Sequence, residues 1–164
     1  MSWFSTRGRG HAAQIATRAA SAGVDIVVVV GGDGTVNEVA NGLAGSDCAL
    51  ALLPAGTGNV LAAQLGLMAL PTTLHKPDPV RAARRLAAGS VRSVDLGYAR
   101  ASGAGGRYFV LWAGVGLDAE IVRRVEDENR ALKRSMGPVA YAAVGMLSLL
   151  EITGTPASLR HDSE

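Results

Sequence analysis

Residues 24–38, with the sequence VDIVVVVGGDGTVNE, decide the fold of this protein. The β-branched run from Val24 to Val30 is continuous, which is the pattern of a parallel strand with both faces covered. After the glycines, apolar residues recur at helical spacing from Val36 to Leu43, and Gly45 is placed to end the helix. The stretch therefore predicts a buried strand, a glycine turn and an amphipathic helix in direct succession.

The same order of elements follows a second time. Ala49–Leu53 is another apolar run, Pro54–Gly58 is a turn-forming segment, and Asn59–Leu67 has the composition of a helix. A strand-loop-helix unit used twice is typical of a domain in which helices cover a parallel sheet. We therefore expect an α/β fold, a layered domain with a parallel sheet.

Further elements are expected on both sides of this repeated unit. Two more helices are predicted, one by a run of helix formers and one by a helix cap at Asp78 followed by a helix-starting proline at Pro79. A β-hairpin is predicted by alternating residues followed by an apolar run. The helices are expected at His11–Ala22 and Pro79–Ala88, the hairpin strands at Val94–Tyr98 and Tyr108–Ala113, and later helices at Leu117–Lys133 and Pro138–Glu151.

The change from strand-helix alternation to antiparallel strands sets the expected domain boundary near Arg92. Residues 1–91 are expected to form the α/β domain and residues 92–152 a second domain with the hairpin and helices. Residues 153–164 are expected to be a polar tail.

The composition excludes several classes of protein. Of the 164 residues 48% are hydrophobic and 18% charged, as in a folded globular chain, and the net charge of +2 gives no basic surface for nucleic acid. The single cysteine, Cys48, excludes an internal disulfide and favours a cytoplasmic environment. Even the apolar segment Met136–Leu150 is shorter than the ~20 residues of a membrane-spanning helix, so no transmembrane segment is expected.

The turn at Gly31–Gly34 carries the clearest chemical signal. Glycines let a phosphate group approach the backbone closely, and the N-terminus of the following helix attracts anions. Asp33 would repel a bare phosphate, so its presence indicates a bridging Mg²⁺. The alternative is that Thr35 and Glu38 form a capping box that stabilises the helix without any ligand.

Two linked motifs resemble a known family. Gly31–Glu38, followed by Leu53–Asn59 with the sequence LPAGTGN, is similar to the catalytic domain of diacylglycerol kinases, sphingosine and ceramide kinases and related bacterial lipid kinases. The likeness continues through Ser93–Gly97 and Ala113–Ala119. It implies an α/β nucleotide-binding domain of the NAD kinase and diacylglycerol kinase type, followed by an incomplete, mainly β second domain. The implied activity is ATP-dependent transfer of the γ-phosphoryl group to a lipid hydroxyl in the cleft between these domains.

The resemblance also implies which residues hold ATP and Mg²⁺. Carried over position by position, the nucleotide-binding residues are Thr6, Gly31, Gly32, Asp33, Gly34, Thr35, Val36, Asn37, Glu38, Thr57, Gly58 and Asn59. Asp33 and Asp95 are the implied metal-facing residues. An ST-turn and a helix cap are the alternative explanation for Thr57 and Asn59, and a solvated strand position is the alternative for Asp95.

The chain departs from the family pattern at particular positions. Val60 and Ala63 stand where family members commonly have Asp and Arg, so a polar contact to phosphate or substrate is not expected there. The family's first strand, with its Asn-Pro-x-x-Gly loop, is not found after Met1, and its catalytic acid is expected beyond Glu164. No catalytic residue is therefore assigned within the chain.

The expected partner is a lipid substrate. The protein is expected to be cytoplasmic and to contact this lipid at the membrane surface. A homodimer is compatible with the sequence. Two alternatives stay open. The first is a non-catalytic nucleotide-binding module, which the missing family segments favour. The second is an NAD kinase. NAD kinases share the GGDGT turn, but at the second motif they have a pattern similar to Asn-x-Gly-x-x-Gly-Phe-Leu, where this chain has LPAGTGN.

Overall fold

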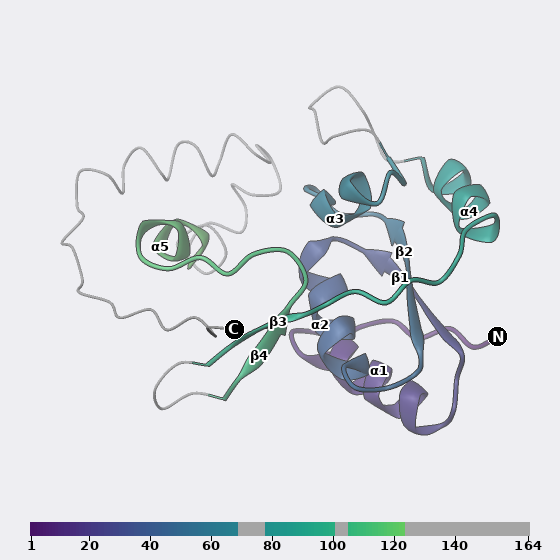
Figure 1. The fold of residues 1–164 in the computed structure, drawn as a ribbon, viewed down its shortest axis with the longest axis horizontal. Helices are drawn as coiled ribbons and strands as arrows, with labels where there is room; N and C mark the ends of the chain where they lie inside the picture. The colour runs from purple at the N-terminus through teal and green to yellow at the C-terminus, as the bar shows by residue number, and fades with distance from the viewer. Residues whose placement is uncertain (69–77, 101–104, 124–164) are drawn as a thin grey trace. The chain divides into compact units, whose positions relative to one another are not determined.

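The computed structural model describes residues 1–68, 78–100 and 105–123. A first compact unit runs from Met1 to Trp112, and a second begins at Ala113. The elements in chain order are α1 (His11–Ser21), β1 (Ile26–Gly31), α2 (Asp33–Leu43), β2 (Ala49–Pro54), α3 (Val60–Gln64), α4 (Pro79–Ala87), β3 (Gly97–Ala99), β4 (Arg107–Phe109) and α5 (Leu117–Arg123) (Figure 1).

Strands β1 and β2 form the parallel sheet that the sequence predicts. Their register pairs Ile26 with Ala49 at one end and Gly31 with Pro54 at the other. Helix α2 connects the two strands, as parallel pairing requires, since a hairpin turn cannot return the chain in the same direction. The expectation of a mixed α/β fold with a parallel sheet is confirmed.

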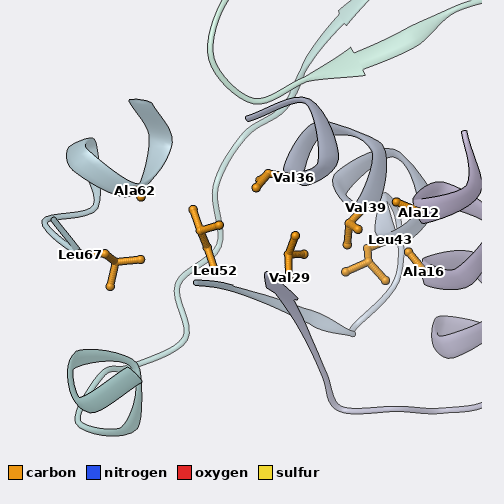
Figure 2. Packing of buried hydrophobic residues seen from close by; sticks show 9 residues of the cluster. All are labelled: Ala12, Ala16, Val29, Val36, Val39, Leu43, Leu52, Ala62 and Leu67. Carbon is orange, nitrogen blue, oxygen red and sulfur yellow. The ribbon is translucent and has the colours of Figure 1, made fainter. Parts of the chain in front are cut away.

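The core of the first unit lies between the sheet and the helices. Figure 2 shows Val29 of β1 pointing toward α2, Leu52 of β2 between α2 and Ala62, and the small residues Ala12 and Ala16 of α1 next to Val39 and Leu43 of α2. Val36 is the largest of the almost fully buried side chains in this core, with 1% of its surface exposed. The buried cluster comprises Ala12, Ala16, Val29, Val36, Val39, Leu43, Leu52, Ala62 and Leu67.

The other face of β1 is open among the described residues, so the expectation that both faces are covered is wrong for this part of the chain. Ile26, Val28 and Val30 point away from the core and are 50%, 48% and 54% exposed. The reason is that α2 packs only on the face that carries Val27 and Val29. A continuous β-branched run is thus compatible with a strand that has one covered face.

The other observed helices and strands differ from the predicted ones mainly in length. Helix α4 starts as predicted, with Asp78 Oδ1 accepting a hydrogen bond from the Arg81 amide at 3.0 Å. Helix α3 is shorter than expected because the chain turns at Gly66, which has a φ of +69°. The hairpin is present with strands of three residues, and it belongs to the compact unit that ends at Trp112.

Several predictions concern parts of the chain that are not described. Helix α5 begins at Leu117 as expected and is described as far as Arg123. The predicted helix at Pro138–Glu151 and the tail at residues 153–164 lie outside the described residues. The domain boundary near Arg92 stays a prediction. In the described ranges, no helix has the length and apolar character needed to cross a membrane.

Helices α1 and α2 approach closely at Gly42, which gives a test of the packing. A methyl group added there would collide with the Ala13 carbonyl oxygen and lie 2.7 Å from Ala16 Cβ. We predict that Gly42→Ala lowers the free energy of unfolding by about 1–3 kcal/mol, because overpacking exceeds the ~1 kcal/mol that alanine gains in helix propensity. Urea unfolding measures this change.

Gly34→Ala is the matched control for this experiment. It makes the same chemical change on the same helix, but the added methyl group meets no atom within 4 Å. Its free energy of unfolding should be no lower than that of the unsubstituted chain. Equal unfolding curves for Gly42→Ala and Gly34→Ala would contradict the close helix contact.

Candidate functional site

The two turns that follow β1 and β2 lie side by side at one edge of the sheet. Because the strands are parallel, their carboxyl ends meet at the same edge, where Gly31 is paired with Pro54. The Ala55 amide donates a hydrogen bond to the Gly31 carbonyl oxygen at 3.0 Å, which extends the pairing into the second turn. The sequence motifs GGDGT and LPAGTGN are thereby brought together.

The turns touch through their backbones at Gly32 and Gly56. A Cβ atom on Gly56 would collide with Gly32 Cα and lie 3.0 Å from the Gly32 nitrogen. A Cβ atom on Gly32 would in turn lie 3.0 Å from Gly56 Cα. Gly56 therefore has no room for a Cβ atom, and a Cβ atom on Gly32 would need the neighbouring backbone to shift.

Asp33 joins the first turn to the helix that follows the second. It is the first residue of α2, and its carboxylate accepts hydrogen bonds from two amides at the start of α3. The Val60 amide donates to Oδ2 and the Leu61 amide to Oδ1, each at 3.1 Å. The negative charge at the N-terminus of α3 also interacts favourably with the helix dipole. Asp33 therefore has a structural role that its position in the motif did not predict.

Asn59 fixes the shape of the second turn. Its backbone has a φ of +53°, in the left-handed region that asparagine tolerates better than most residues, and only 3% of its surface is exposed. Oδ1 accepts a hydrogen bond from the Gly56 amide at 2.8 Å, and Nδ2 donates to the Gly56 carbonyl oxygen at 2.6 Å. Its side chain does not cap α3. Asn59 thus holds Gly56 against the first turn.

Glu38 is also engaged within the protein. Its carboxylate accepts hydrogen bonds from the Gly10 amide at 2.8 Å and the Ala12 amide at 3.2 Å, at the start of α1. The capping box with Thr35 is not formed, because α2 begins at Asp33 and its cap residue, Gly32, makes no side-chain cap hydrogen bond. Glu38 stabilises a different helix from the one it belongs to.

The first turn of α2 has amides that are available to a ligand. The Val36 amide donates to the Gly32 carbonyl oxygen at 3.1 Å, so the amides of Asp33, Gly34 and Thr35 precede the first intrahelical bond. No residue in the described ranges accepts a hydrogen bond from these amides. Gly34 is exposed, and the space where its side chain would be is open. The turn is therefore open to an approaching anion at Gly34.

The remaining candidates differ in what they can contribute. Val36 is a core residue whose amide is already used, so it supports the helix. Thr6, Thr57 and Asp95 are exposed. Asn37 has a buried Oδ1 atom with no hydrogen-bond partner within the described part of the chain. These ranges also contain no group of three or more His, Cys, Asp or Glu side chains placed to hold a metal.

Comparisons with known proteins now decide the family. Residues 1–99, which include both turns, match the family described as diacylglycerol kinase catalytic domain. The chain belongs to this family. The expected resemblance is confirmed.

Two relatives and a solved structure with diacylglycerol kinase names are similar to this chain, in agreement with the family. The chain is 33% identical over 165 residues to a diacylglycerol kinase of Bacillus subtilis (strain 168), covering 99% of this chain and 50% of the relative. It is 32% identical over 153 residues to a diacylglycerol kinase of Mycobacterium tuberculosis (strain ATCC 25618 / H37Rv), covering 93% and 46%. A crystal structure from Bacillus anthracis str. Sterne, of a candidate diacylglycerol kinase, matches with a TM-score of 0.53 and 25% identity, covering 90% of this chain and 44% of that one. The chain spans about half the length of these relatives.

The cofactors that the diacylglycerol kinase family implies fit the described residues to different degrees. ATP fits, because free amides and an exposed glycine stand where phosphate groups need donors and room. Mg²⁺ fits in a narrower sense. Both oxygens of Asp33 already accept an amide, which leaves one lone pair on each for a metal. Such a site needs further oxygen ligands from phosphate and water, as is usual for Mg²⁺.

The double hydrogen bond of Asp33 yields a stability test. Asp33→Ala should lower the free energy of unfolding by about 1–3 kcal/mol, because two amides of α3 lose a charged acceptor. Asp33→Asn keeps the shape and one acceptor, so it should lower the free energy of unfolding by less than Asp33→Ala does. Urea unfolding of both variants is the measurement, and an Asp33→Ala chain as stable as the original would contradict this clamp.

Proposed function

We propose that this chain binds ATP at the N-terminus of α2 and serves as the nucleotide-binding part of a lipid kinase. The observation that carries the proposal is the set of free amides at Asp33, Gly34 and Thr35, which lies within the residues that match the family. Backbone amides at a helix N-terminus bind phosphate well because the donors point outward and the helix dipole attracts negative charge. The exposed Gly34 supplies room for phosphate oxygens.

The proposed acceptor is the hydroxyl group of a lipid such as diacylglycerol, met at the membrane surface. The hydroxyl oxygen attacks the γ-phosphorus, the bond from that phosphorus to the bridging oxygen of ADP breaks, and the hydroxyl proton passes to a base. Mg²⁺, when bound, would neutralise phosphate charge. The described residues contribute binding and orientation, and the base is not assigned to any of them.

Each residue around the turn has a separate part in the proposed binding. Asp33, Gly34 and Thr35 offer amides to the phosphates. The contact of Gly32 with Gly56 keeps the second turn beside them, so that Thr57, which is exposed, can reach the same ligand. These roles need no side chain with a perturbed pKa, since phosphoryl transfer depends mainly on positioning and charge.

Two other functions are outcomes of the same test. The first is a chain that binds ATP without transferring phosphate, which would leave all offered acceptors unlabelled. An NAD kinase is disfavoured by the second motif, since LPAGTGN lies in the region that matches the lipid kinase family. Radiolabelled ATP offered with diacylglycerol, sphingosine and NAD separates these outcomes by where the label appears.

Gly34→Ala tests the proposed binding site directly. The substitution should leave the fold intact, since the new methyl group meets no protein atom within 4 Å. Because a helical Cβ is tilted toward the N-terminus, the methyl group would stand where phosphate approaches the amides. We predict that the Kd for ATP, measured by calorimetric titration, rises at least about tenfold, the equivalent of one or two lost hydrogen bonds to a charged group.

The control for ATP binding is Gly105→Ala. The glycine lies in the loop before β4, and a methyl group there also meets nothing within 4 Å. Its Kd for ATP should stay within about twofold of the original. If Gly34→Ala binds ATP as tightly as Gly105→Ala does, phosphate does not sit at the first turn of α2 and the proposal is wrong.

A further inference from the structure

Asn41 links α2 to the hairpin through both polar atoms of its side chain. Nδ2 donates a hydrogen bond to the Tyr108 carbonyl oxygen at 2.8 Å, and Oδ1 accepts one from the Tyr108 amide at 2.9 Å. Nδ2 also donates to the Asn37 carbonyl oxygen, one helical turn earlier, at 2.8 Å. Both protons of the amide group are therefore used, and the side chain is held in one orientation.

With this pair of hydrogen bonds, the side chain of Asn41 bonds to the Tyr108 backbone as a neighbouring strand would. Tyr108 lies opposite Tyr98 in the antiparallel hairpin, between the pairs Ala99–Arg107 and Gly97–Phe109. Successive residues of a strand direct their backbone groups to opposite sides. Since Tyr108 directs its amide and carbonyl to Asn41, it faces away from β3, and the outer edge of β4 is closed by the side chain of Asn41.

The geometry of the two tyrosines agrees with this arrangement. If Tyr108 directs its backbone groups to α2, its pair with Tyr98 is a non-hydrogen-bonded one, in which side chains come closer than in the alternate pairs. The ring centroids of Tyr98 and Tyr108 are 5.0 Å apart, with an angle of 56° between the ring planes. The ring contact therefore stiffens the hairpin at the residue that Asn41 holds.

Few residue types could replace Asn41. Asparagine is a poor helix former, so its place within α2 has a cost in helix propensity. Only an amide side chain of this length supplies a donor and an acceptor together to one backbone unit. An aspartate at this position could accept from the Tyr108 amide, but it would set a carboxylate oxygen against the Tyr108 carbonyl oxygen.

We propose that Asn41 is a positioning residue, which holds the β3–β4 hairpin on the helix whose N-terminus binds phosphate. Asn41 lies eight residues after Asp33 on α2, about 12 Å along a rigid helix axis. The segment before β3 carries Asp95, so holding the hairpin also holds Asp95 relative to the phosphate site. This last consequence rests on the proposed function, while the docking of the hairpin does not.

Amide hydrogen exchange at Tyr108, followed by NMR, tests the docking. In the unsubstituted chain the Tyr108 amide donates to Asn41 Oδ1 and should exchange slowly. Asn41→Ala removes this acceptor, and exchange at Tyr108 should become at least about tenfold faster. Gln14→Ala, an exposed polar substitution on α1, is the control and should change it by less than about twofold. Slow exchange retained in Asn41→Ala would overturn the proposal.

Asn41→Asp places a titratable group at the two hydrogen bonds and adds a pH dependence to the docking. The ionised carboxylate repels the Tyr108 carbonyl oxygen, whereas the neutral acid can donate to it and accept from the Tyr108 amide. Docking therefore favours the protonated form and raises the pKa of the new carboxyl group above its usual value of about 3.9. Protection of Tyr108, relative to the original chain at each pH, should rise as pH falls from 7 toward 4. A flat profile would contradict the two-bond geometry.

Kinetics and ATP titration separate this proposal from the proposed function. In a lipid phosphorylation assay, Asn41→Ala should lower kcat about tenfold and leave the KM for ATP within about twofold, because the phosphate amides are unchanged. An unchanged kcat would overturn the link to Asp95. A chain that binds no ATP would refute the proposed function, and exchange at Tyr108 would still decide whether Asn41 docks the hairpin.

Discussion

The backbone contact between Gly32 and Gly56 is the constraint on which the rest of the site depends. It brings the ends of β1 and β2 so close that Gly56 has no room for a side chain and Gly32 has very little. Asp33 and Asn59 then secure the contact from both sides, one through the amides of α3 and the other through the backbone of Gly56. The structure therefore uses Asp33 and Asn59 to build the turns, and the first amides of α2 have no acceptor among the described residues.

Much of the fold was predictable because it follows from periodicity. The β-branched run before Gly31, the apolar stripe of α2 and the cap at Asp78 each produce the element they predict. The two glycine turns were also found correctly, since such turns between strand and helix have a recognisable composition. The open face of β1 was not predictable, because the same run suits a strand with one covered face or two.

The partners of the polar residues could not be predicted from local sequence. Asp33, Glu38 and Asn41 all lie in α2, yet their side chains bond to α3, α1 and β4 respectively. Contacts between residues this far apart in sequence leave no pattern in the spacing of neighbours. The one signal for Asn41 was weak, namely an asparagine within a helix that would favour a better helix former. Family resemblance assigned Asp33 to ligand binding, and only the geometry reveals its second role.

The most direct test of the account is an NMR titration of the ¹⁵N-labelled chain with ATP and Mg²⁺. If phosphate binds at the N-terminus of α2, the amide signals of Asp33, Gly34 and Thr35 should shift most, with smaller shifts at Thr57 in the adjacent turn. Signals of α1 and α4 should stay in place. Saturable binding with its largest shifts away from α2, or no binding at millimolar ATP, would contradict the claim that this turn is a phosphate site.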